Sequence, residues 1–498
     1  MRYVSVPIAA IALVALTILT RLPALVQTHA IDDEAIYSVV ANEIIDGGKP
    51  YRDAIERKPP LLFYTYAAVY RFAGKYNWAA LHIVAVLWTL ATMAGLFGIG
   101  RSLFGAKTGL FAALLYSLFQ PATSFKNLGF NGELLMNLPI VCAWAIAFAK
   151  GRSRARPELF IAGVLSCVAF LLKQPAAIAA VPLGIYLLLP SHRVERRLTS
   201  RDSIVQFATF ASGFVLILGV MILFLQREGI LRDAIYWTIE DHVAPHFFVD
   251  RFVRNSATFA VASFALIAGA VCSCETWRAR RAEWIALVLL AIASAVGAGA
   301  GGRFYSHYYI QLLPPLALLA APFYANVWSD AAVPRRDVWR GLSAIWLGLT
   351  LLVFPFAIAH QFAHVRHATQ TGAYLAAQHA PTERLFVWGQ DPQIYLEARM
   401  RPASRYVTTF ALTGYIFGGP IPGLDTRRFV RAGAWENLQR DFAQHPPAYI
   451  IDMQRDADGE LIHDYPISNF PILQRIVDEQ YSVVAHTAEA VIYRRVNR

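Results

Sequence analysis

The chain of 498 residues is 56% hydrophobic and only 16% charged, with a mean hydropathy of +0.41. Charged residues make up about a quarter of a typical soluble domain, so this composition excludes a soluble globular protein and indicates an integral membrane protein. A net charge of +11 would also suit nucleic-acid binding, but the lysines and arginines lie in short loops between apolar runs, where they set membrane orientation. We therefore expect no nucleic-acid partner.

Apolar runs long enough to cross a bilayer recur along the chain. The first is longer than the apolar core of a signal peptide and is not followed by a small-x-small cleavage site, so we expect a retained span. Eleven spans are predicted in all, some of them short. Their approximate limits are 4–26, 79–100, 108–121, 132–149, 158–173, 175–190, 203–226, 256–274, 284–302, 309–327 and 341–360.

Basic residues indicate the side of the membrane that each loop occupies. With the N-terminus in the cytoplasm, the basic loops at 150–157, 191–202 and 275–283 all fall on the cytoplasmic side. The loop after the first span and everything after about residue 361 then lie outside. Every segment with candidate chemistry is predicted to share that outer face.

The polar loop at 29–60 separates two strongly apolar runs and gathers acids and bases into one segment. Its first part predicts an amphipathic helix that ends at Gly47 and Gly48, and we expect this helix to lie in the membrane interface with its apolar face toward lipid. Pro59 and Pro60 restrict the backbone just before the next helix and hold the preceding charged residues at a defined height.

Adjacent acids and bases in this loop suit the transfer of a sugar from a polyprenyl-phosphate donor. The leaving group of such a donor is an anionic phosphate, which Lys58 and Arg57 could stabilise. The acceptor hydroxyl needs a carboxylate to take its proton, and Asp33 is the candidate base, with Asp32 and Glu34 on either side. The alternative is a solvated loop whose charges pair with one another. The choice of base between Asp32 and Asp33 stays open.

Further polar residues lie at the predicted outer ends of spans. Glu133 is a second candidate acid, or an acid that merely suits a helix N-terminus. Lys173 is a candidate phosphate ligand, or an interfacial lysine that reaches for headgroups. Arg303, His307 and Tyr308 could bind phosphate or sugar hydroxyls, although tyrosine is also an ordinary membrane anchor.

Asp241, His242 and His246 are residues of metal-ligand type in the loop at 227–255. Pro245 breaks the helical register that would align the two histidines. A divalent metal ion at these residues is left open, and no other cofactor is predicted.

The last part of the chain is polar and changes character. Short β-type runs at 384–389, 405–409, 448–452 and 481–487 alternate with helical patterns at 434–445 and 471–480, which predicts a small α/β domain. The sequence contains no nucleotide-binding glycine motif there.

The motifs of the first loop resemble those of a known family. Asp33-Glu34 is followed by Tyr37, then by Gly48-x-Pro50-Tyr51-x-Asp53 and Glu56-x-Lys58-Pro59-Pro60-Leu61. This spacing resembles the first extracytoplasmic loop of the dolichyl-phosphate-mannose protein mannosyltransferase superfamily, whose bacterial members include the lipid A aminoarabinose transferases. The likeness extends to Asn131-Gly132-Glu133, Lys173-Gln174-Pro175 and Arg303-Phe304-Tyr305-Ser306-His307-Tyr308.

The resemblance implies a GT-C fold and an inverting glycosyltransferase that uses a lipid-phosphate-linked sugar. It places the catalytic acid on Asp33 with Glu34 beside it, a second acid on Glu133, and the lysine of the family on Lys58. The three consecutive acids that begin with Asp32 depart from the simple pattern. The residues expected to bind substrate or phosphate are Lys58, Arg57, Glu56, Tyr37, Lys173, Arg303, His307 and Tyr308.

We therefore expect a polytopic α-helical membrane protein with about eleven transmembrane helices and a small C-terminal extracytoplasmic α/β domain. The GT-C catalytic domain is predicted at 1–360, with the active-site loop at 29–78, and the α/β domain at 361–498. The expected partners are a polyprenyl-phosphate-linked sugar, a lipid, glycan or protein acceptor, and membrane lipids. The resemblance further implies a bacterial inner membrane and a role in lipopolysaccharide or other cell-envelope biogenesis.

A multispan transporter or flippase of lipid-linked sugars is the alternative function. Transporters tend to place ionisable residues near the membrane midplane and often contain repeated halves. Here the charges lie mostly in outer loops and the two halves of the sequence do not match. Both features favour the transferase.

Overall fold

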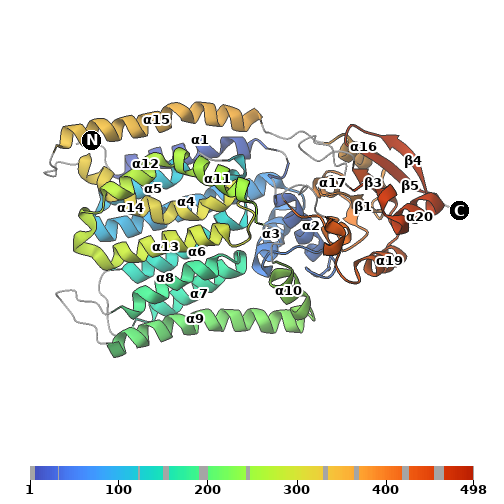
Figure 1. Ribbon diagram of the computed structural model, residues 1–498, viewed down its shortest axis with the longest axis horizontal. Coiled ribbons are helices and arrows are strands. Elements are labelled where there is room, and N and C mark those ends of the chain that lie inside the picture. Colours follow the sequence, from blue (N-terminus) through green and yellow to red (C-terminus); the bar gives the residue numbers. More distant parts are fainter. Residues whose placement is uncertain are drawn as a thin grey trace. The chain divides into compact units, whose positions relative to one another are not determined.

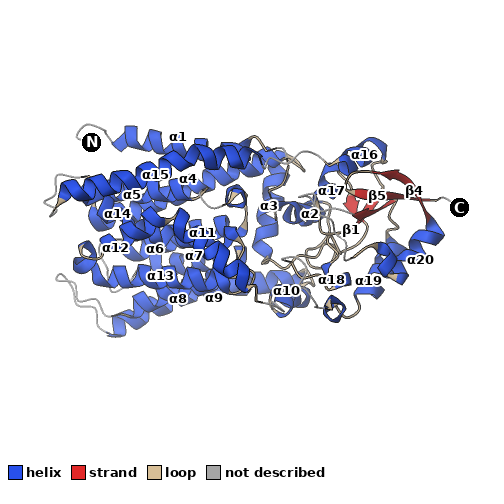
Figure 2. Cartoon of the chain, turned by 45° about the horizontal axis from the view of Figure 1, so that its top comes forward, coloured by secondary structure: helices blue, strands red, loops and turns tan. Residues whose placement is uncertain are grey.

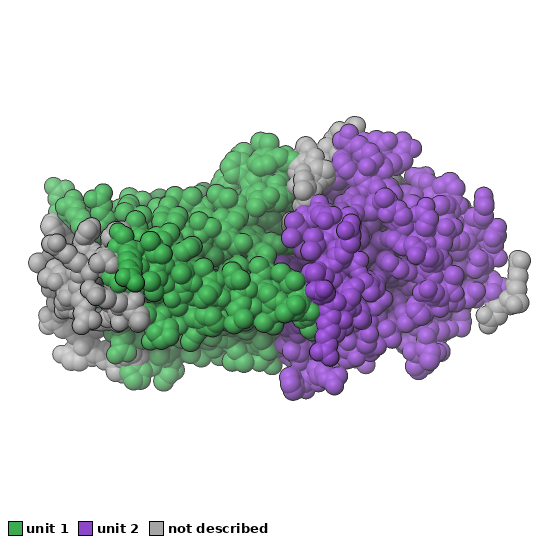
Figure 3. Space-filling view, turned by 90° about the horizontal axis from the view of Figure 1, so that it is seen from below, with its two compact units in different colours: residues 1–27, 81–224, 246–365 green, residues 28–80, 225–245, 366–498 purple. Residues whose placement is uncertain are grey.

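A computed structural model describes residues 6–27, 29–31, 33–121, 124–149, 156–189, 200–242, 247–328, 335–363, 369–417, 425–453 and 465–496. The chain divides into two compact units (Figure 3). We call the first, which comprises Met1–Gln27, Leu81–Phe224 and His246–Val365, the helical unit. The second comprises Thr28–Ala80, Leu225–Pro245 and Arg366–Arg498, and we call it the sheet unit.

Long apolar helices build the helical unit (Figure 1). Each of the eleven predicted spans overlaps one of these helices or a consecutive pair of them. The helices of this unit, with the short 3-10 helices between them, are α1 (Val6–Leu25), α4 (Trp78–Phe104), α5 (Ala106–Phe119), η1 (Phe125–Leu128), α6 (Gly132–Phe148), α7 (Glu158–Leu172), α8 (Ala176–Leu188), α9 (Ser200–Arg227), α11 (Val249–Ala262), α12 (Phe264–Cys272), η3 (Thr276–Arg280), α13 (Arg281–Gly299), η4 (Ser306–Leu312), α14 (Leu313–Val327) and α15 (Arg336–Ala363).

Membrane-spanning helices are confirmed, whereas the number eleven stays a prediction. Within the described ranges, five helices are long and apolar enough to cross a membrane, and the pair α11 and α12, bent by 67°, would make a sixth. The apolar helices α5, α6, α7 and α8 are shorter. The five are Pro7–Leu25, Trp78–Phe104, Ser200–Arg227, Thr276–Gly299 and Ser306–Val327.

The burial of individual helices separates the core of the helical unit from its rim. The span that contains α14 is 83% buried, and its residues belong to the main apolar core. The span of α9 is only 17% buried and presents large apolar side chains such as Val215, Leu216 and Leu223 outward. An exposed apolar helix surface of this extent suits contact with lipid.

Two glycines bring α7 and α9 into backbone contact. A Cβ atom on Gly163 would meet the carbonyl oxygen of Phe210, and one on Gly213 would meet the carbonyl oxygen of Phe160. Helices in lipid associate mainly through close van der Waals packing, for which small residues are required at the crossing point. The crossing therefore depends on the absence of a side chain at both glycines.

The sheet unit combines the first loop with a mixed β-sheet (Figure 2). The strand order is β2-β1-β3-β5-β4, in which β1 pairs parallel with β2 and β3, and β5 pairs antiparallel with β3 and β4. Its elements are α2 (Glu34–Ile45), α3 (Pro60–Ala73), α10 (Leu231–Thr238), η2 (Glu240–His242), α16 (Gln370–Gln378), β1 (Arg384–Trp388), α17 (Gln393–Glu397), β2 (Arg401–Pro402), α18 (Phe410–Thr413), η5 (Thr426–Phe429), α19 (Ala434–Gln444), β3 (Tyr449–Met453), η6 (Ile467–Asn469), α20 (Pro471–Gln480), β4 (Tyr481–His486) and β5 (Ala490–Arg495).

Most elements predicted for the C-terminal segment are confirmed. The runs at 384–389, 448–452 and 481–487 form β1, β3 and β4, and the two helical patterns form α19 and α20. The predicted strand at 405–409 is wrong, because the backbone there bends and Arg405 turns toward Asp441 instead of pairing in the sheet. Strand β5 was missed, since its short apolar run ends in charged residues.

The predicted helix of the first loop is confirmed as α2, but its surroundings differ from the prediction. Residues 34–43 are all buried, and α2 packs against α3 and α17. Its apolar face is therefore part of the core of the sheet unit and is not open to lipid. Gly47, with a φ of +89°, follows the end of the helix in a conformation that favours glycine.

The close packing of α7 on α9 leads to a prediction about the stability of the protein. Gly163→Ala should lower the free energy of unfolding by about 1–3 kcal/mol, because the new methyl group displaces one helix backbone from the other. The measurement is the thermal unfolding midpoint of the detergent-solubilised protein.

Gly219→Ala is the matched control, since it lies on α9 with open space where its Cβ would be. It should leave the unfolding midpoint unchanged or raise it slightly, because alanine has the higher helix propensity. Equal effects of the two substitutions would contradict the proposed role of Gly163.

Candidate active site

Two ion pairs attach the first loop to the segment at 225–245. Arg52 donates to Asp233 Oδ2 from Nε at 3.1 Å and from Nη2 at 2.6 Å. Lys49 Nζ donates to the carbonyl oxygen of Glu228 at 2.7 Å and lies 3.3 Å from its carboxylate. These two ion pairs fix the first loop against the segment at 225–245.

The first loop is also attached to the C-terminal sheet. The Arg401 guanidinium grips the Glu43 carboxylate with two hydrogen bonds, of 3.0 Å from Nε and 2.7 Å from Nη2. The backbone N–H of Ile55 donates to the carbonyl oxygen of Arg405 at 2.9 Å. Because Glu43 is buried, its carboxylate depends on this cation for stabilisation.

Asp33, Tyr37, Glu56 and Lys58 lie together, and we call them the first-loop cluster. The Tyr37 hydroxyl donates to Asp33 Oδ2 at 2.8 Å, and Lys58 Nζ lies 5.8 Å from the centre of the Tyr37 ring. Lys58 Nζ also donates to Glu56 Oε1 at 3.2 Å. A half-buried carboxylate and a buried ammonium are therefore arranged around one fully buried tyrosine.

Glu34 has a different environment from its neighbour Asp33. Its side chain is fully buried, and Oε2 accepts a hydrogen bond from the backbone N–H of Ile31 at 2.7 Å. This bond closes the turn that leads into α2. Asp32 lies outside the described residues.

Arg57 is held by aromatic rings. Its guanidinium lies 4.7 Å from the centre of the Phe410 ring and 5.0 Å from that of Phe417. Its Nη1 is 3.9 Å from Asp241 Oδ2. Cation–π contacts in a desolvated site stabilise the charge by about 2 kcal/mol and fix the orientation of the planar group.

The open question of a metal ion concerns Asp241, His242 and His246. The Asp241 carboxylate pairs with Arg431 as well as lying near Arg57. The side chain of His242 and all of His246 lie outside the described residues. Among the side chains that are described, no group of three or more histidine, cysteine, aspartate or glutamate residues is arranged to hold a metal.

Tyr51 supports the backbone of the first-loop cluster. It has a φ of +67°, which is uncommon for a residue with a side chain. Its hydroxyl donates to the carbonyl oxygen of Lys58 at 2.8 Å. Burial, reinforced by the nearby Tyr64 and Glu56, raises the pKa of Tyr51 well above its ordinary value, so this hydroxyl stays protonated and remains a donor.

A second group of predicted residues meets in the helical unit. Lys173 Nζ lies 2.8 Å from Glu133 Oε1 and 5.1 Å from the centre of the Tyr308 ring. Both charged side chains are buried. Gly132 permits this approach, since a Cβ there would come within 2.8 Å of the Lys173 side chain. We call Glu133, Lys173 and Tyr308 the bundle cluster.

Arg303 and His307 lie just before and within η4, the element that also carries Tyr308. The Arg303 side chain is buried, and no described residue accepts a hydrogen bond from its Nε. The His307 ring stacks on Tyr305 with centres 5.7 Å apart. A buried guanidinium donor that no side chain accepts suits an anionic ligand.

Several residues that shape the site were not predicted. Phe410, Phe417 and Arg401 contact the first loop from positions far along the chain, and Asp233 contacts it from the middle. No local pattern marks them, because each is ordinary in its own segment. Tyr51 was part of the recognised motif, and its motif position was the only signal for its role.

Comparisons with known proteins bear on the same segments. Residues 57–223 match the model of a family described as dolichyl-phosphate-mannose-protein mannosyltransferase. No curated protein sequence matches the chain.

Solved structures share the fold over nearly the whole chain. ArnT from Cupriavidus metallidurans bound to undecaprenyl phosphate has a TM-score of 0.61 at 14% identity, over 98% of each chain. Its apo state gives 0.62 at 14% identity, over 98% of this chain and 97% of that one. The archaeal oligosaccharyltransferase AglB from Archaeoglobus fulgidus, in complex with an inhibitory peptide and a dolichol-phosphate, gives 0.56 at 12% identity, over 89% of this chain and 69% of that one. At these identities the likeness establishes a shared fold.

The burial of the Glu43–Arg401 pair leads to a prediction about how strongly the first loop is attached to the sheet. Arg401→Ala should lower the free energy of unfolding by about 2–4 kcal/mol, because it leaves a buried carboxylate without its cation. The loss should appear as a lower thermal midpoint and as faster proteolysis of the first loop.

Arg427→Ala provides the control, since it breaks an equally bidentate pair with Asp425 that is exposed. Solvent and salt screen an exposed pair, so this variant should behave like the unmodified protein. An unchanged midpoint in Arg401→Ala would show that the loop is held without Arg401.

Proposed function

We propose that the chain is a glycosyltransferase of the GT-C type and that it transfers a sugar from a polyprenyl-phosphate donor to a hydroxyl group of a lipid, glycan or protein acceptor. The reaction takes place at the outer face of the membrane and inverts the anomeric centre. Both lipid-bound structures with this fold support the donor class, since one holds undecaprenyl phosphate and the other a dolichol-phosphate.

The observation that carries the proposal is the arrangement of Asp33 and Lys58 around Tyr37. Glycosyl transfer from a lipid phosphate needs a carboxylate for the acceptor proton and a cation for the phosphate, close to each other. Tyr37 supports both requirements, because its hydroxyl binds Asp33 and its ring faces the Lys58 ammonium.

In the proposed step, the acceptor oxygen attacks C1 of the donor sugar while Asp33 takes the hydroxyl proton. The bond between C1 and the phosphate oxygen breaks, and its electron pair leaves with the polyprenyl phosphate. Lys58 and Arg57 stabilise the charge that develops on that phosphate. Glu56 and the ring of Tyr37 position the Lys58 ammonium.

Asp33 is the better candidate base of the two described acids at the start of α2. The Asp33 side chain is half-buried and is not used to cap the helix. Glu34 is enclosed and accepts a backbone hydrogen bond from Ile31, so we assign it to the structure of the turn. A carboxylate offers about four lone-pair sites, so it can accept from Tyr37 and from an acceptor hydroxyl at the same time.

The bundle cluster and Arg303 form the second part of the proposal. Lys173 is oriented by Glu133 and Tyr308 and is suited to bind a phosphate oxygen. The buried Arg303 adds a donor of the planar type that phosphate binds with two oxygens. His307, which follows in η4, is assigned to the same phosphate or to sugar hydroxyls.

The proposed orientation follows from the basic loops. Loops such as 150–157 and 275–283 are rich in lysine and arginine and are assigned to the cytoplasm. The first loop and the C-terminal α/β domain then face outward, in the inner membrane of a bacterium. Cell-envelope glycans and lipids are the acceptors that this orientation favours.

The direct test uses membranes that contain the protein and a polyprenyl-phosphate donor with a labelled sugar. Asp33→Asn should reduce transfer about 10²- to 10⁴-fold, the usual loss when a general base is removed. The abundance of the protein in the membrane should be unchanged, because asparagine keeps the size and the hydrogen bond to Tyr37.

Asp46→Asn is the control for this experiment. Asp46 caps the other end of α2 and pairs with Lys75 at 2.6 Å, so its loss should affect stability slightly and transfer little. Full transfer by Asp33→Asn would reject the base assignment. Absence of any label transfer by the unmodified protein, with every donor and acceptor class tried, would count against the transferase itself.

A second variant tests the phosphate role. Lys58→Ala should raise the KM for the donor about tenfold or more, since a charge-assisted hydrogen bond contributes about 1.5–3 kcal/mol. Lys58→Arg should restore part of the donor affinity, and Lys75→Ala, which removes a lysine outside the cluster, should have no effect. A donor KM that does not respond to Lys58→Ala would exclude it as a phosphate ligand.

A further inference from the structure

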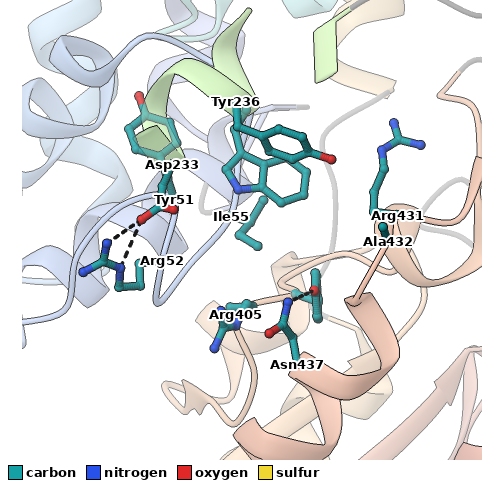
Figure 4. Close-up of a pocket in the computed structure, with 11 residues that line it drawn as sticks. Tyr51, Arg52, Ile55, Asp233, Tyr236, Arg405, Arg431, Ala432 and Asn437 are labelled. Atoms are coloured by element: carbon teal, nitrogen blue, oxygen red, sulfur yellow. Dashed lines mark hydrogen bonds and ion pairs between the residues drawn. The ribbon is translucent and has the colours of Figure 1, made fainter. Parts of the chain in front are cut away.

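The sheet unit contains a cavity of about 200 Å³ that the proposed reaction does not use (Figure 4). Four separate segments line it. Tyr51 and Ile55 come from the first loop, Tyr236 from α10, Tyr406 from the bend after β2, and Asn437 from α19. The volume is about that of one or two small-molecule rings, well below a drug-sized pocket.

Three arginines line the cavity, yet the cavity is not a site of net positive charge. Each guanidinium is paired with an aspartate: Arg52 with Asp233, Arg405 with Asp441, and Arg431 with Asp241, which also lies near Arg57. The six charges cancel. A phosphate or sulfate group would therefore gain little from entering, because each cation already binds an anion.

The cavity wall presents hydrogen-bond acceptors beside donors. Asp233 contributes a carboxylate, the three arginines contribute N–H groups, and Asn437 contributes both a carbonyl oxygen and an amide. Burial raises the pKa of Tyr236 and of Tyr406, so both hydroxyls stay protonated. A ligand that matches such a wall must donate and accept at several neighbouring positions, as a polyhydroxylated ring does.

Aromatic rings supply the apolar part of the wall. Tyr236 and Trp237 contact each other edge to face, with centres 4.9 Å apart. The Tyr236 ring extends into the space between Ile55 and Arg431 (Figure 4). The C–H face of a sugar ring is apolar while its rim is polar, so it can pack on such rings and bond at its edge.

We propose that this cavity binds a saccharide ring of the acceptor. The inference rests on the proposed function and narrows it, because it makes the acceptor a glycan or a glycolipid with an exposed sugar. A sugar of the acceptor held here would contribute affinity and orientation away from the reacting hydroxyl.

Residues that line the cavity also contact the first-loop cluster and the aromatic ring beside Arg57. Tyr51 lines the cavity and donates its hydroxyl hydrogen bond to the carbonyl oxygen of Lys58. Trp237 contacts Phe410, and the ring of Phe410 makes a cation–π contact with the Arg57 guanidinium. The same residues therefore support the acceptor subsite and position the proposed phosphate ligands.

The first experiment measures binding without any reaction. The purified full-length protein is studied by saturation-transfer difference NMR with D-glucose, D-galactose, D-mannose and D-glucosamine. At least one sugar should give a signal, and Tyr236→Ala should weaken its binding about fivefold, the effect of losing about 1 kcal/mol of contact. Tyr236→Phe, which keeps the ring, should lose less.

Tyr374→Ala is the matched control, because Tyr374 is also half-buried but lies on α16 and does not line the cavity. It should bind the sugars like the unmodified protein. No signal from any of the sugars, or an equal signal from Tyr236→Ala, would overturn the proposal. The proposal would also be overturned if inorganic phosphate stabilised the protein and Tyr236→Ala removed that stabilisation, since the cavity would then be an anion site.

The second experiment uses the transfer assay. Tyr236→Ala and Asn437→Ala should each raise the KM for the acceptor about fivefold and leave the KM for the donor unchanged. An unchanged acceptor KM would overturn the acceptor role. If the sugars bind in a Tyr236-dependent manner but no transfer occurs, the proposed function fails while the saccharide site stands. If transfer depends on Asp33 but not on Tyr236, the proposed function stands while the saccharide site fails.

Discussion

The buried carboxylate of Glu43 can exist only because Arg401, 358 residues further along the chain, grips both of its oxygens. Removing an ion from water costs several kcal/mol, and this cost is offset only when a partner of opposite charge is held in good geometry. The pair therefore couples the folding of the first loop to that of the C-terminal sheet. The alignment of Ile55 with Arg405 and the burial of α2 both depend on that coupling.

Paired charges buried in the protein are a feature that the first-loop cluster and the bundle cluster share. Glu56 with Lys58 and Glu133 with Lys173 are enclosed, and Asp241 is shared by Arg57 and Arg431. Buried ion pairs add little to stability compared with apolar side chains of the same size. Their density here is better explained by function, since fixed charges in a poorly solvated site stabilise a developing charge without having to reorganise.

Much of the fold and part of the site could be predicted from the sequence. Apolar length located the helices of the helical unit, and the spacing from Asp33 to Leu61 led to the family whose model matches residues 57–223 and to a fold that ArnT shares. The strand at 405–409 and the lipid-facing surface of α2 were wrong for one reason: both depend on contacts with distant segments. The same reason hid Phe410 and Phe417, which hold Arg57 although nothing in their own segments indicates it.

The sequence by itself determined that this is a membrane protein and pointed to the loop at 29–60 as the place of the proposed chemistry, because hydropathy and motif spacing are local properties of the chain. Only the tertiary structure distinguished Asp33 from Glu34, since the two are adjacent in sequence and differ in what surrounds them: Tyr37 donates to Asp33, whereas Glu34 is enclosed against the backbone of Ile31. It alone also formed the cavity beside Tyr51, whose walls come from four separate segments. Burial and pairing decide what a charged side chain can do, and both arise from segments that meet only when the chain folds.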